Sequence, residues 1–153
     1  MTTRIEACLA ALFGILPVPA HDGQKERNPT SAEKPPAGGK AGLFDGKGEP
    51  IDTFMLGAGR TLYVFAHTAE LEFAIEGKDE AERRLAADAY ILQVEEAVAA
   101  DRTLGGLADI VQLQPAERSD DVPVDPEKKS RGTPFRFLSL PVRIEYTTEN
   151  SAG

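Results

Sequence analysis

The sequence is poor in the side chains from which proteins usually build active sites. Its 153 residues include two histidines, one cysteine and no tryptophan. The single cysteine, Cys8, excludes an internal disulfide, as is usual for proteins of reducing compartments. Neither His21 nor His67 has a second histidine or a cysteine at ligand spacing, so no zinc site is expected. His67 falls on the apolar face of a predicted strand, where we expect a hydrogen-bonded core or rim residue and not a catalytic base.

Nucleophile and nucleotide-binding motifs are missing as well. None of the five serines has the strand-turn context of a hydrolase nucleophile. Gly57-Ala58-Gly59-Arg60 lacks the rest of a dinucleotide fingerprint, and Gly38-Gly39-Lys40 lacks the spacing of a phosphate-binding loop. We therefore expect no catalytic, cofactor-binding or metal-binding residues, and a protein that is not an enzyme.

Positive charge and long apolar runs are also scarce. Seventeen basic residues face 25 acidic ones, for a net charge of −8, which argues against direct nucleic-acid readout. No stretch is long and apolar enough to predict a membrane span. Ten acidic and three basic residues lie between Ala69 and Asp101, so this segment holds most of the net charge. A solvated strand and helix face explains it, and the alternative is a surface turned toward a pore or a basic partner.

The N-terminal segment predicts an amphipathic helix over about Thr3 to Ile15. Thr3-x-x-Glu6 is a capping box, apolar residues recur at helical spacing, and Pro17 stops the helix. A charged residue followed by an apolar run also suggests a signal peptide, but Glu6 at its start and the helical period oppose that interpretation.

Two polar segments predict flexible loops, at about residues 20–40 and 114–133, because both are rich in proline, glycine and charge without any period. Asp45-Gly46 between apolar runs predicts a hairpin, with Ile51 to Leu56 as its return strand and a further turn at Gly57 to Gly59.

The clearest strand is Thr61 to Glu76. Its odd-numbered residues are apolar, and acidic residues dominate the even positions of its second half, which indicates one buried face. Leu62, Val64 and Ala66 make the first half apolar on both faces, so we expect that half to be covered twice or to form an interface.

The remainder predicts a helix over Lys78 to Asp101 and strands over Leu107 to Leu113 and Phe135 to Thr148. Pro141 in the last strand suggests an edge position or a bulge. Together these elements predict one α+β domain over residues 1–153. We expect an antiparallel sheet of about four to five strands with two helices packed on one face.

The most distinctive string follows the second predicted helix. Its glycines permit a tight turn that returns the chain to the sheet. The string closely resembles one in the phage tail terminator family, the minor tail protein U-like proteins, whose genes are often read from prophages. Its residues, which the resemblance marks as possible assembly positions, are Asp101, Arg102, Thr103, Leu104, Gly105, Gly106 and Leu107.

Shorter pieces add to this resemblance from about Arg4 to Thr148. They are Arg4-Ile5-Glu6, Arg27-Asn28, Asp45-Gly46 and the end strand Leu140 to Thr148. The segments Ala20 to Lys40 and Gln114 to Thr133 depart from the family.

The resemblance implies a structural protein without a cofactor. Such proteins cap the tail tube as a ring, usually of six copies, ending elongation and forming the surface that meets the head. The implied partners are further copies of the chain, the tail tube protein and the head-tail connector protein, with no membrane. Members can be monomers in solution. The implied location is the bacterial host cytoplasm during assembly and then the virion tail.

The alternative from another class is a ferredoxin-like module that binds a small regulatory ligand, which an apolar pocket with buried polar groups would favour.

Overall fold

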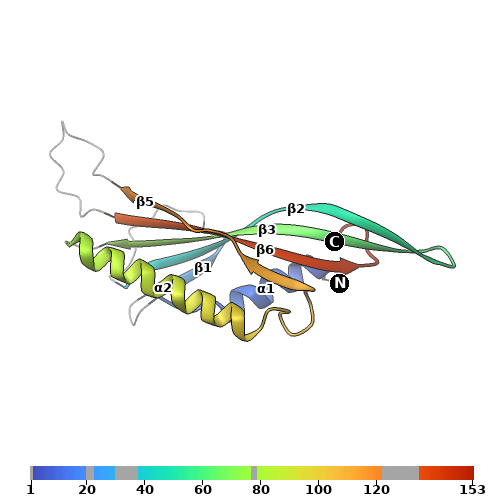
Figure 1. Ribbon diagram of the computed structural model, residues 1–153, viewed down its shortest axis with the longest axis horizontal. Coiled ribbons are helices and arrows are strands. Elements are labelled where there is room, and N and C mark those ends of the chain that lie inside the picture. The colour runs from blue at the N-terminus through green and yellow to red at the C-terminus, as the bar shows by residue number, and fades with distance from the viewer. Residues whose placement is uncertain (1, 20–22, 30–37, 77–78, 122–134) are drawn as a thin grey trace.

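A computed structural model of the chain describes residues 2–19, 23–29, 38–76, 79–121 and 135–153. The described residues form two helices and six strands, and all six strands join one sheet (Figure 1). In chain order they are α1 (Arg4–Ile15), β1 (Gln24–Arg27), β2 (Lys40–Gly57), β3 (Arg60–Glu76), α2 (Glu80–Ala100), β4 (Ile110–Leu113), β5 (Glu117–Asp121) and β6 (Phe135–Thr148).

The sheet is mostly antiparallel. Its strands lie in the order β1-β2-β3-β6-β4, and β5 pairs with β6 farther along the same side as β4. Only β1 and β2 run parallel. The predicted α+β class is confirmed, but the sheet has six described strands and not four or five.

Both helices begin at the side-chain caps that their sequences contain. Thr3 is the N-cap of α1, and its hydroxyl accepts a hydrogen bond from the Glu6 amide at 3.3 Å. Asp79 caps α2 in the same way, accepting from the Ala81 amide at 2.9 Å. These contacts satisfy amide donors that have no partner within a helix. The predicted helix ranges are therefore confirmed to within one or two residues.

The hydrophobic core lies against one face of the two long central strands. Leu71 and Phe73 of β3 pair with Leu140 and Leu138 of β6, and all four side chains are buried. The ring of Phe73 stacks on that of Tyr90 in α2, with their centroids 4.4 Å apart. Residues of both helices join this cluster, among them Cys8, Leu9 and Leu12 of α1 and Ala87, Ile91, Val94 and Val98 of α2. The alternation predicted for the long strand is confirmed, because Glu70 and Glu72 on its other face are exposed.

The predicted hairpin at Asp45-Gly46 is wrong. Strand β2 runs without a turn through this point to Gly57, and Asp45 and Gly46 form a bulge between the pairs Phe44↔Glu70 and Lys47↔Thr68. The actual reversal is the predicted second turn, where Ala58 and Gly59 link β2 to β3. An Asp-Gly pair supplies positive φ, which a bulge needs as much as a turn does, and pairing with the long β3 selects the bulge.

Two short strands lie inside the segments predicted as loops. β1 falls within residues 20–40 and β5 within residues 114–133, and both consist of polar residues that carry no strand pattern. They form because β2 and β6 offer free edges to which they can pair. Residues 20–22, 30–37 and 122–133 of the predicted loops lie outside the described residues.

Pro141 occupies neither an edge strand nor a bulge, since β6 is paired on both sides. It falls where the partner of β6 changes from β4, which ends opposite Val142, to β5, which begins opposite Ser139. The Pro141 carbonyl accepts a hydrogen bond from the Gln114 amide at 2.9 Å in that gap. Because the nitrogen and oxygen of one strand residue point the same way, the missing N–H faces the gap and no ladder bond is lost.

The strand after α2 begins three residues later in the structure than the sequence predicts. Leu107 to Asp109 continue the turn, and β4 runs only from Ile110 to Leu113.

Candidate interaction site: a projecting hairpin arm

An arm, residues 47–62, projects from one end of the molecule (Figure 1). It consists of β2 beyond the bulge, the turn, and the start of β3. Residues 47–53 pair with β3 residues 63–68, whose other edge β6 covers, and only the tip, residues 54–62, is a hairpin paired with nothing else. β1 covers the edge of β2 only as far as Leu43, and β6 ends opposite Tyr63. Every residue from 46 to 60 is exposed, so the arm stands clear of the core.

The arm ends in a tight turn. Ala58 and Gly59 form a two-residue loop between the paired residues Gly57 and Arg60, with φ values of 50° and 76°. Positive φ at both loop residues is the type I′ geometry, whose twist matches that of paired strands. The two strands of the arm are thus joined by a tight hairpin turn, and β3 continues directly from it into the core.

Large apolar side chains are concentrated on the arm. Ile51, Phe54, Met55 and Leu56 are 45%, 50%, 86% and 49% exposed. They make up half of the eight large hydrophobic side chains exposed among the described residues. Apolar side chains gathered at one exposed place usually mark an interaction site. Sequence reasoning missed them because it assigned Ile51 to Leu56 to the return strand of a hairpin at Asp45-Gly46. The available signal was the start of β3, which is apolar on both faces.

The outer edge of β2 is unsuited to adding another strand. Pairing with β3 shifts register at three places in β2, each time with an extra residue in β2, and Pro50 contributes no N–H. Bulges and prolines are common devices that keep an exposed edge from pairing with another chain. We infer that the arm makes contacts through its side chains and not by extending the sheet.

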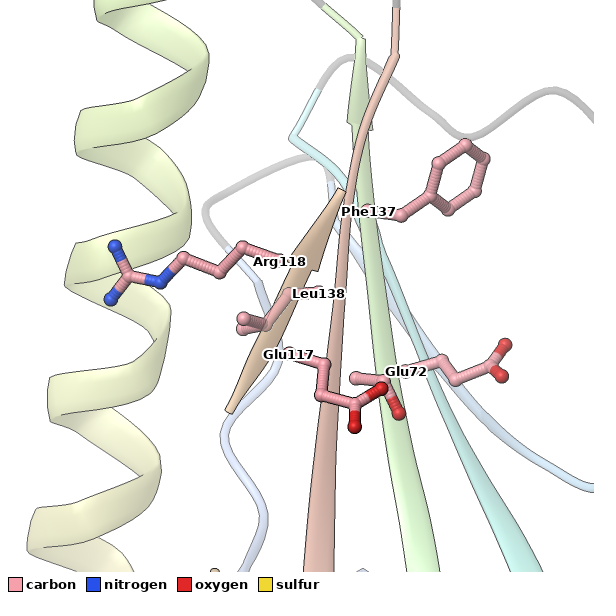
Figure 2. Close-up of a pocket in the computed structure, with 6 residues that line it drawn as sticks. Glu72, Glu117, Arg118, Phe137 and Leu138 are labelled. Carbon is pink, nitrogen blue, oxygen red and sulfur yellow. The ribbon is translucent and has the colours of Figure 1, made fainter. Parts of the chain in front are cut away.

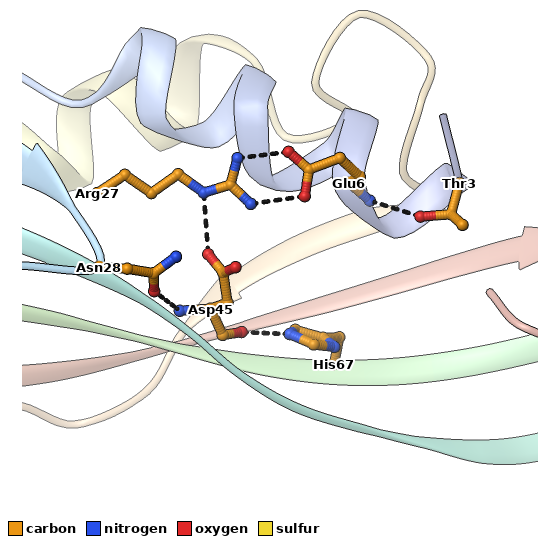
Figure 3. Close-up of polar contacts among 6 residues, drawn as sticks. All are labelled: Thr3, Glu6, Arg27, Asn28, Asp45 and His67. Carbon is orange, nitrogen blue, oxygen red and sulfur yellow. Dashed lines mark hydrogen bonds and ion pairs between the residues drawn. The ribbon is translucent and has the colours of Figure 1, made fainter. Parts of the chain in front are cut away.

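An ion-pair network holds the base of the arm (Figure 3). The Arg27 guanidinium in β1 donates two hydrogen bonds to the Glu6 carboxylate of α1, at 2.5 and 2.7 Å. Its Nε donates to Asp45 Oδ1 at 2.9 Å, in the bulge of β2. One side chain thereby connects the first helix, the edge strand and the point where the arm leaves the body.

The backbone of Asp45 is fixed from two further directions. The Asn28 side-chain oxygen accepts a hydrogen bond from the Asp45 amide at 3.0 Å. The Asp45 carbonyl accepts one from Nε2 of His67 in β3. Because a carbonyl oxygen can only accept, Nε2 must carry the proton. His67, which is 8% exposed, is therefore a hydrogen-bonded rim residue, as the sequence predicts.

The network also changes the ionisation of its carboxyl groups. Hydrogen bonds from Arg27 hold the pKa of Glu6 below its ordinary value. Burial raises the pKa of Asp45, but hydrogen bonds from Arg27 and Asn28 outweigh that effect and leave the pKa lowered. Both groups therefore stay charged in the folded protein to a lower pH than in the unfolded chain.

A second cation of β1 secures the other end of α1. Lys25 Nζ donates to the carbonyls of Phe13 and Leu16, at 2.8 and 3.0 Å, and lies 4.7 Å from the centre of the Phe13 ring. Cations at this position satisfy the free carbonyls of a helix C-terminus. A strand that sequence reasoning missed thus attaches both ends of α1 to the sheet.

The string marked by the family resemblance forms the turn from α2 to β4. Asp101 is the C-cap of α2, and its carboxylate accepts a hydrogen bond from the Gly105 amide at 3.0 Å. Leu104, Gly105 and Gly106 have φ values of 50°, 69° and 89°, so three consecutive residues are left-handed. The buried Leu104 side chain anchors the turn in the core.

The turn brings the seven predicted positions together, but only four of their side chains or backbones are exposed enough to contact a partner. Leu104 is buried, Asp101 and Leu107 are half-buried, and the exposed members are Arg102, Thr103, Gly105 and Gly106. Three of the four shorter pieces of the resemblance converge elsewhere, because Glu6, Arg27, Asn28 and Asp45 all belong to the network at the arm base.

A shallow hollow lies on the sheet, where β5 and β6 run beside β3 (Figure 2). It measures about 330 Å³ and is lined by Glu72, Glu117, Arg118, Phe137, Leu138 and Ser139. The Arg118 side chain turns toward α2, where it pairs with Asp88 at 2.8 Å. Three of the six lining residues are charged and exposed, unlike the apolar pocket that a small-ligand module needs.

Neither a metal-binding cluster nor a membrane-spanning helix is found in the described part of the chain. No three of its histidine, cysteine, aspartate and glutamate side chains are placed to hold an ion. Neither described helix is both long and apolar enough to cross a bilayer.

Comparison of the sequence with protein-family models and with curated proteins finds no match.

We expect Arg27→Met to lower the free energy of unfolding by about 1 kcal/mol at pH 7, because the carboxylates it binds are partly exposed. The pKa values of Glu6 and Asp45 are lowered on folding. The stabilisation is therefore complete above the unfolded-state values near 4 and is lost as the pH falls through the lower folded-state values. Urea unfolding from pH 7 to pH 3 should show wild type and variant converging toward acid. Arg102→Met, at an exposed arginine, is the control, and a pH-independent difference would refute the role of the network.

Substitutions at two glycines should have opposite effects. Gly46 has φ +72°, and a Cβ there would lie 1.8 Å from the Thr68 carbonyl oxygen, so Gly46→Ala should destabilise the protein by about 2 kcal/mol or more. Gly14 in α1 has no atom within 4 Å of its Cβ position, so Gly14→Ala should stabilise by about 0.5–1 kcal/mol. Thermal unfolding of both variants measures this, and a neutral Gly46→Ala would mean that the bulge is not required.

Proposed function

We propose that this chain is a non-enzymatic structural subunit of the phage tail terminator type, which caps the tail tube as a ring. The observation that carries the proposal is the projecting arm, whose exposed apolar side chains the body of the molecule leaves uncovered. Exposed apolar surface of this kind is normally buried against another protein. The resemblance of the Asp101–Leu107 turn to the tail terminator family supports further copies of the chain on a tail tube as that partner.

The layering of the body supports a role in assembly. We infer that both helices cover the same sheet face, because Leu12 of α1 and Val94 of α2 share one core with Phe73. The opposite face then remains available. It carries Glu70 and Glu72 away from the arm, in keeping with an acidic surface that lines a ring or meets a basic partner.

The small contact area of the arm favours assembly on a template, which here is the end of the tail tube. From Pro50 to Gly57 each face measures about 25 Å by 10 Å, at about 3.3 Å per residue and 4.8 Å per strand, so two faces present about 500 Å². Each partner in a stable interface contributes about 800 Å². A pair held by one arm would be weak, whereas a ring of six closed on a tube end gains contacts on every side. We therefore propose a monomer in solution and a ring on the tail.

The proposed partners are further copies, the tail tube protein and the head-tail connector protein. The protein would act in the bacterial host cytoplasm during assembly and then remain in the virion tail. The alternative, a ferredoxin-like module for a small ligand, stays a prediction; the hollow at Glu72 is a candidate site for it, and the lining there does not favour it.

Electron microscopy of the protein mixed with cognate tail tubes tests the proposal directly. We expect density at the tube ends and shorter tubes when the protein is present during tube growth. Protein that never binds tube ends, at any concentration or salt, would overturn the proposed function.

An arm variant sharpens this test. Phe54→Ser combined with Met55→Ser should abolish tube-end binding while leaving the melting temperature within about 2 °C, because both side chains are exposed and outside the core. Val18→Ser is the matched control, since Val18 is 49% exposed and lies away from the arm. Tube-end binding that survives in the double variant would show that the arm is not the assembly element.

A further inference from the structure

Helix α2 carries a second exposed apolar surface, on the side turned away from the core. Leu85 and Leu92 are 68% and 63% exposed. They are seven residues apart, which is two helical turns, so they lie on the same side of the helix. Leu92 comes two residues after the buried Tyr90, which places it on the opposite side from the core. Exposed alanines extend this line at both ends, at Ala81 and Ala99. We call these four residues the α2 seam.

A seam of this kind is unusual for a surface helix. Such a helix normally has one apolar stripe, which faces the core, and polar residues elsewhere. In α2 the core stripe is complete without the seam, because Ala87, Tyr90, Ile91, Val94 and Val98 are all buried. The seam therefore has the composition of a contact surface with no partner in the described part of the same chain.

We propose that the arm of one copy packs on the α2 seam of the next copy. This inference rests on the proposed self-assembly and names the surfaces that perform it. The arm lies at one end of the long axis, and α2 begins at the other (Figure 1). Two different surfaces at opposite ends make a head-to-tail contact, in which every copy offers one arm and one seam. Such a contact repeats from copy to copy and gives a ring when the rotation closes.

Charge favours the arm over a second α2 as the occupant of the seam. Two acidic residues, Glu95 and Glu96, lie beside the seam, so two seams face to face would bring like charges together, whereas the charge of Asp88 is balanced by Arg118. Residues 50–59 of the arm contain a single charged residue, Asp52, whose carboxylate already accepts the Thr53 amide at 2.8 Å.

The length of the apolar stretch on the arm also matches that of the α2 seam. The exposed residues Ile51 to Leu56 extend about 16 Å along the strand. Leu85 and Leu92 are about 10 Å apart along the helix axis, and the part of the seam from Leu85 to Ala99 is about 21 Å long. An arm laid along the helix can therefore cover both leucines.

Thiol cross-linking between two variants tests the contact. Met55→Cys and Leu92→Cys are prepared separately, mixed at high concentration and treated with a short bismaleimide. The native Cys8 is fully buried, and burial raises the pKa of its thiol to about 11, so it should not react. We expect the mixture to give a cross-linked dimer at a several-fold higher yield than either variant alone. A mixture of Met55→Cys with Ser151→Cys, an exposed position away from the seam, is the control for random collisions.

Each other outcome overturns the pairing. Cross-linking of Leu92→Cys to itself would assign the seam to a second α2, and self-cross-linking of Met55→Cys would indicate an arm-to-arm contact. A yield no higher than the Ser151→Cys control would exclude the contact altogether. The result is independent of the tube experiment. A cross-link without tube capping would retain the interface and reject the function, whereas capping without the cross-link would do the reverse.

Discussion

The ionic contact between Arg27 and the Asp45 bulge lies at the point where β2 leaves the hydrophobic core. Before it, β2 lies between β1 and β3 and contributes Ala41 and Leu43 to the core. After it, β2 pairs with β3 alone and every residue up to Arg60 is exposed. A bulge bends a strand and increases its twist, and here hydrogen bonds with three residues, Arg27, Asn28 and His67, fix that bend. The direction of the arm is therefore a property of the body and not of the arm alone.

The residues that stabilise the fold are therefore different from the exposed apolar residues of the arm, which we propose to bind a partner. The core contains β3, β6 and both helices, and its free energy of folding does not depend on the apolar side chains of the arm tip. Those side chains are free to match a partner without cost to the fold. The arm and the α2 seam are also distinct surfaces, so association through them produces an ordered series of copies and not a closed pair.

Sequence reasoning predicted the elements whose pattern is local. α1 and α2 follow from caps and composition, and β3 and β6 follow from strict alternation. It failed where pairing decides the outcome. β1 is Gln-Lys-Glu-Arg, and only a free edge of β2 and two contacts with α1 make it a strand. The Asp-Gly pair was placed in a turn because its positive φ is local information, whereas the choice between turn and bulge depends on β3.

The candidate site was partly visible in the sequence. The first half of β3 is apolar on both faces, which indicates a surface covered by something outside the sheet. The extent of the arm was hidden, because a wrong turn at Asp45 shortens the hairpin by about ten residues. The seam was hidden for another reason: Leu85 and Leu92 are apolar like the core residues of α2, and only the exposure of each side chain in the structure separates the two sides of the helix.

The account depends most on the claim that Arg27 and Asp45 hold the arm in one direction. Pulsed electron spin resonance measures this, with spin labels at Met55 in the arm and Gln93 on α2, both exposed, in protein diluted into unlabelled chain. The account predicts a single narrow distance distribution that broadens when Arg27 is replaced by methionine. A distribution that is already broad in the wild-type protein, or one that Arg27→Met leaves unchanged, would contradict it.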